Sequence, residues 1–377
     1  MTRELLLEDR RQGVFGAAAA MVRGWFGGGR DRAAGADAVA AEAARAGAPP
    51  AARADRGAED PPDVRLRAAL AGASRSLWQH ALGAAAGAVA APGTLQALRA
   101  TVTRVLDGEL AERHFPRRPL LMPQLLAATR DPSAAATRLA DIISRDPVLA
   151  GNVLRLANSA WYRVTQDPVE TLQRAVIVCG TDGLQSLAAL ALMQPVFRGE
   201  SGAFGRLPAL LWERTTRATL AAELYAQRVC PGERHSAQLL VLLRALGPLV
   251  VFRVIDEHYR AQPGLPRDAA ACATLLAELG GRAAARIAAQ WDSSARIRGV
   301  LAELDVHDRV HVPDEVQMDL AAAVEVGELL GTTSVLIAEQ VWDGAAGLQL
   351  AGEAGMPRDW VLATMTRLGR APDRNSP

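Results

Sequence analysis

The spacing of apolar residues after residue 63 is the feature that most constrains the fold. Helical periodicity recurs along this part of the chain, whereas alternating strand patterns are scarce. In the segment 145–162, Asp146 is suited to cap a helix and Pro147 to occupy its first turn. An apolar stripe follows at i, i+4, i+7 and i+11, formed by Leu149, Val153, Leu156 and Ala160. The sequence therefore predicts an all-α protein.

Similar patterns predict further helices over 66–90, 93–110, 131–144, 170–179, 182–194, 209–229, 235–258, 267–290, 294–304, 314–330, 332–342 and 357–368. The piece "RAVIVCG", residues 174–180, is the one strand-like run. It lacks the glycine spacing of a dinucleotide loop. We interpret it as a helix that ends at Gly180, with Thr181 or Asp182 capping the next helix.

The first 62 residues differ from the rest in composition. A short helix is expected at about 3–26, followed by a run rich in Ala, Gly, Pro and charge that offers little to bury. We predict a disordered or partly helical tail and linker. The short helix could contact a partner or, less favourably because of its acidic residues, a membrane, through Leu5, Leu6, Phe15, Trp25 and Phe26.

Composition excludes several classes of chemistry. The chain has no lysine, which removes P-loop, kinase, Schiff-base and Ser-Lys mechanisms. Its net charge of +1 gives no general attraction to nucleic acid. The scattered Cys179, Cys230 and Cys272 are typical of reduced thiols, and neither a signal peptide nor twenty uninterrupted apolar residues is found. We expect a cytoplasmic protein without a membrane span.

One charged residue interrupts the most apolar segment of the chain. In "LLVLLRALGPLVV", residues 239–251, Arg244 stands among aliphatic side chains. Desolvating a guanidinium without a partner costs several kcal/mol. This position therefore calls for an explanation.

The middle of the chain resembles the HDOD domain, a relative of the HD and HD-GYP metal-dependent phosphohydrolases. The likeness is carried by "RDPVLAGNVLRLANSAWY", "TLQRAVIVCGTDGLQSLAALAL", "LWERTTRATLAAELYAQR", "LLVLLRALGPLVV" and "ELGGRAAARIAAQW". It implies a multi-helix HD-like bundle over 116–310. The helical patterns predict an N-terminal extension over 63–115, and Trp342, Met356 and Trp360 indicate that C-terminal helices over 311–377 pack on the bundle. The residues that match the structural signature are Asp146, Pro147, Asn158, Ser159, Gly180, Gly247 and Trp291.

The same resemblance places the metal ligands of catalytic relatives on unsuitable residues. The upstream histidine corresponds to Arg214, and the His-Asp pair corresponds to Arg244 and Ala245. A later histidine falls near Gly280, and a downstream His-His pair falls at Leu304 and Asp305, of which only Asp305 could bind a metal. Guanidinium groups at two ligand positions would repel a cation. We therefore expect no metal, no cofactor and no catalytic residue.

Other histidines offer weaker candidates for a metal site. "HDRVH" contains His307, Asp308 and His311, but we interpret it as a polar loop close to a proline. His235 is expected at a helix start and His258 in an exposed helix end with Asp256 and Glu257. The basic run at 113–119 is expected to be a solvated face rather than a nucleic-acid site.

Three functions remain open from the sequence. The first is a non-catalytic bacterial signalling or regulatory module that contacts another signalling protein. The second is a pseudoenzyme in which Arg214 and Arg244 bind a nucleotide or another anion. The third is a residual metal-dependent phosphohydrolase. Whether the two arginines face a shared cavity or pair with acids such as Glu213 or Asp305 would separate the first two.

Overall fold

The computed structural model describes residues 61–85, 87–108, 135–159, 162, 167–197, 206–291, 293–305 and 313–369. Within these ranges the regular elements are all helices, which confirms the all-α prediction. The predicted tail, except for its last two residues, lies outside the described part of the chain.

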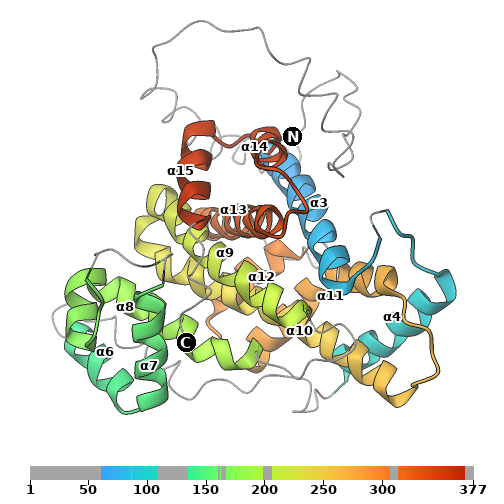
Figure 1. Cartoon of the computed structure of the whole chain (residues 1–377), viewed down its shortest axis with the longest axis horizontal. Coiled ribbons are helices and arrows are strands. Elements are labelled where there is room, and N and C mark those ends of the chain that lie inside the picture. The colour runs from blue at the N-terminus through green and yellow to red at the C-terminus, as the bar shows by residue number, and fades with distance from the viewer. Residues whose placement is uncertain are drawn as a thin grey trace, which may run out of the picture.

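Four long helices form the centre of the molecule (Figure 1). They are α9 (Leu207–Val229), α10 (Arg234–Ala261), α11 (Ala269–Gln290) and α13 (Glu315–Ala338). Helix α13 packs against α9 very closely, because Gly327 and Gly331 carry no side chain. A Cβ atom at Gly331 would lie 2.7 Å from the backbone nitrogen of Ala218. The interface therefore depends on glycine at this point of contact.

This tight packing corrects one prediction. The sequence suggested two helices over 314–330 and 332–342, with a break at Gly331. The structure has one continuous helix, since Gly331 serves the close approach to α9 rather than a helix end. At the start of the helix, Asp314 and Gln317 form a reciprocal capping box.

Two N-terminal helices lie against this centre (Figure 1). Helix α3 (Pro62–Leu82) packs on α13 and α11, and α4 (Pro92–Asp107) packs on α11 and α10. Helix α3 ends eight residues before the predicted limit of 90. Gly83 adopts a left-handed conformation, with φ of 72°, and its N–H bonds to the carbonyl of His80.

Helices α6 (Ala135–Ser144), α7 (Pro147–Ala157) and α8 (Leu172–Phe197) form a lobe at one side of the molecule (Figure 1). The Asp146 carboxylate caps α7 by accepting from the N–H groups of Val148 and Leu149, at 2.9 and 3.1 Å. The Asn158 side chain bonds to both backbone groups of Val169, at 2.7 and 2.8 Å. These contacts hold the two ends of α7 in place.

Helix α8 bends by 112° at Gly180. Gly180 has φ of 73° and ψ of 174°, a conformation that L residues with a side chain rarely adopt. The strand-like run before it is helical, as expected.

The remaining elements are the short 3₁₀ helix η1 (Pro231–Glu233), α12 (Ala295–Leu304), α14 (Gly344–Glu353) and α15 (Arg358–Leu368). Helix α14 was not predicted, although Asp343 caps it. Helices α14 and α15 pack on each other and on α13, and Trp342 and Met356 are buried there. The C-terminal residues thus extend the same core.

By length and composition, two described helices could cross a membrane: residues 231–261, which include α10, and α13. This differs from the expectation drawn from uninterrupted apolar runs. In the fold, 83% of the most apolar window of the first and 94% of that of the second are buried against other protein segments. In this structure both helices lie mostly within the protein core.

Candidate functional site

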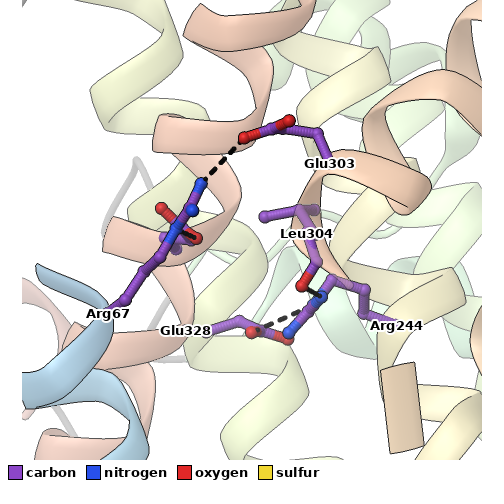
Figure 2. A network of polar contacts seen from close by, with 6 residues as sticks. Arg67, Arg244, Glu303, Leu304 and Glu328 are labelled. Carbon is purple, nitrogen blue, oxygen red and sulfur yellow. Dashed lines mark hydrogen bonds and ion pairs between the residues drawn. The ribbon is translucent and has the colours of Figure 1, made fainter. Parts of the chain in front are cut away.

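Arg244 is paired with a carboxylate on another helix. From α10 its Nε atom lies 3.1 Å from Oε2 of Glu328 on α13, and its Nη1 donates to the carbonyl of Leu304 at 3.4 Å. Figure 2 shows the guanidinium directed at both groups. The side chain is only 18% exposed. The charge within the apolar segment is therefore compensated inside the protein.

Arg214 contacts the other oxygen of the same carboxylate. Its Nη2 atom lies 3.3 Å from Oε1 of Glu328, and its Nε donates to the hydroxyl of Thr332 at 2.9 Å. Its guanidinium carbon also lies 5.6 Å from the ring centre of Trp78 on α3. Glu328, whose side chain is 3% exposed, thus bridges two arginines from different helices.

A second ion-pair group extends the network to the N-terminal helix. Arg67 on α3 donates from Nε to Glu325 at 2.8 Å and from Nη2 to Glu303 at 3.1 Å. Figure 2 shows Arg67 reaching toward Glu303 beside the Arg244–Glu328 pair. Glu325 and Glu328 lie one turn apart on α13. Five helices, α3, α9, α10, α12 and α13, therefore meet at one buried polar cluster.

The charges of this cluster influence one another. Burial raises the pKa of Glu328, but Arg244 and Arg214 outweigh burial, so the pKa is lowered and the group stays ionised. Burial likewise opposes the charge of Arg244, but Glu328 and other carboxylates leave its pKa raised. For Glu325 burial prevails over Arg67, and the pKa is raised. Burial lowers the pKa of Arg214. Glu328 is thus the carboxylate that holds the network together.

The positions equated with metal ligands do converge in space. Arg214 and Arg244 share Glu328, and Leu304 supplies a carbonyl to Arg244. Asp305, 7% exposed, contributes to the raised pKa of Arg244. Ala245 is completely buried and carries no polar side chain.

The small residues beside this cluster bring α10 and α11 together. A Cβ atom on Gly247 would lie 1.9 Å from the carbonyl oxygen of Gly280, and the Pro248 ring packs over Gly280. Trp291, at the end of α11, is buried as well. Gly247 and Trp291 therefore have packing roles.

The sequence suggested Glu213 and Asp305 as acids that could pair with the two arginines. Glu213 forms an ion pair with Arg217, one turn along α9, whereas Arg214 and Arg244 both contact Glu328. Asp305 acts on Arg244 by raising its pKa. The sequence interpretation missed Glu328 because it lies on a helix beyond the resemblance. A signal was present: Glu325 and Glu328 are two carboxylates three residues apart in an otherwise apolar stretch.

The other histidine candidates are "HDRVH", His235 and His258. "HDRVH" lies outside the described residues. His235 follows the first residue of α10, as expected, and His258 packs edge-on against the ring of Tyr259. Asp256 was expected in an exposed helix end, but it is only 8% exposed. Among the described residues, no three His, Cys, Asp or Glu side chains are grouped so as to hold a metal ion.

Comparison with known proteins identifies the family. Residues 115–303 match the HDOD domain, which is half of the chain. No curated protein matches.

Several solved structures are similar to this chain at low sequence identity. An HDOD domain protein with unknown function from Geobacter sulfurreducens is 18% identical, with a TM-score of 0.49 over 73% of this chain and 94% of that one. A protein of Shewanella amazonensis named as a candidate metal-dependent phosphohydrolase is 16% identical, with a TM-score of 0.46 over 73% and 97%. A candidate signal transduction protein of Marinobacter aquaeolei is 19% identical, with a TM-score of 0.45 over 74% and 63%.

Proposed function

Because the chain belongs to the HDOD domain family, we propose that it is a non-catalytic regulatory module that acts through contacts with another signalling protein. The observation that carries this proposal is the Glu328 carboxylate held between Arg214 and Arg244. It fills the place that the family resemblance assigns to a metal centre. The bundle is retained, while the chemistry at its centre is replaced by internal ion pairs.

The arrangement disfavours a metal-dependent phosphohydrolase. Metal ligands must offer lone pairs, whereas a guanidinium is only a donor and stays protonated in proteins. Arg214 and Arg244 place two positive charges where a cation would have to bind, and Glu328 is already engaged by both. A metal at this centre would have to displace an existing ion pair.

The arrangement also disfavours an anion or nucleotide pocket at the same place. Three arginines, Arg67, Arg214 and Arg244, face three glutamates in the cluster, so no positive charge is left over for a ligand. An incoming phosphate would have to displace the Glu328 carboxylate from both arginines. Glu328 has little room to move away, because α13 packs very closely on α9. We therefore rank the protein-contact function above the pseudoenzyme.

The proposal is tested by removing the charges of the central side chains while keeping their volume. In the triple variant Arg214→Met, Arg244→Met, Glu328→Met, a buried ionic group becomes an apolar one of similar size, a change that is often neutral or stabilising. The variant should replace the wild-type chain in cells that lack it, because the interacting surface is unchanged. Circular dichroism and thermal melting confirm the fold.

Two results would contradict the proposal. One is loss of the cellular phenotype in the triple variant while it remains folded, which would show that the central charges take part in function. The other is a stoichiometric amount of manganese, iron or zinc in the purified full-length chain, measured by mass spectrometry, together with phosphohydrolase activity.

A further inference from the structure

We draw no further inference here: the strongest candidate, the surface of the lobe formed by α6, α7 and α8, where the Val148 and Ile177 side chains are 70% and 73% exposed, is an apolar surface for which nothing in the described part of the chain shows what covers it.

Discussion

Neutralising Glu328 is the most direct test of the central ion-pair network. In Glu328→Gln the shape is nearly unchanged, but Arg214 and Arg244 lose their shared counter-charge. Their side chains are 4% and 18% exposed, so water cannot fully replace it. Removing one partner of a buried ion pair costs about 3–5 kcal/mol. We expect the free energy of unfolding to fall by that amount.

The expected change is measurable by calorimetry. Unfolding entropy is about 2.1 cal/mol/K per residue, so for roughly 300 folded residues a loss of about 3–5 kcal/mol lowers the Tm by about 5–8 °C. The control is Glu278→Gln, which breaks the pair with Arg99 at a site where the side chains are 39% and 44% exposed. An exposed pair contributes about 0–1 kcal/mol, so the control should melt within about 2 °C of the wild type.

The pH dependence has a defined sign. The pKa of Glu328 is lowered in the folded protein, so its contribution is present above its unfolded pKa of about 4.3 and is lost as the pH falls through the folded pKa. The difference in the free energy of unfolding between the wild type and Glu328→Gln should therefore be constant from pH 6 to 8 and become smaller below about pH 4. A Tm change as small as that of the Glu278→Gln control would refute the view that Glu328 compensates both arginines.

Three further predictions concern the rest of the fold. Burial raises the pKa of Asp319 to about 6, so ionising this carboxyl disfavours the folded state as the pH rises from about 4 to 6. Asp319→Asn should raise the Tm clearly at pH 7.5 and by much less at pH 4.5, and an equal effect at both would contradict this. Gly331→Ala places a Cβ atom 2.7 Å from the backbone of Ala218, and should cost about 1–3 kcal/mol in denaturant unfolding; an unchanged midpoint would show that α13 can shift. Asp146→Ala removes the cap of α7 and should cost about 1 kcal/mol by the same measurement, whereas Asp146→Asn should restore most of it.

Much of the fold could be predicted from residues that begin, end or bend helices. Asp146 and Pro147 mark a helix start whose cap contacts the structure shows, and Gly180 marks a bend. Gly331 was misinterpreted because a glycine that ends a helix and a glycine at a helix contact look alike in one sequence. What separates them is the neighbouring helix, here Ala218 on α9, and that pairing is not encoded locally.

The site could be predicted in part. The family resemblance located Arg214 and Arg244, which meet at one point although thirty residues separate them. The partner could not be deduced, since Glu328 lies 84 residues beyond Arg244 and any nearby acid was an equal candidate. The available signal was a pair of glutamates, Glu325 and Glu328, in an apolar helix. This pair points to the partner of Arg244 only once it is known that the arginine is buried and needs a negative charge beside it.

The bridge formed by Glu328 also constrains how such a sequence can change. A chain with Arg214 and Arg244 but without the glutamate would hold uncompensated charge in its core, and a chain with the glutamate alone would do the same with the opposite sign. We therefore expect positions 214, 244 and 328 to vary together among homologues. Restoring a metal centre would require replacing both arginines and releasing Glu328 in one step, because each single replacement passes through a destabilised protein. Under the proposed function, the ion pairs would therefore hinder the appearance of a metal centre at this place.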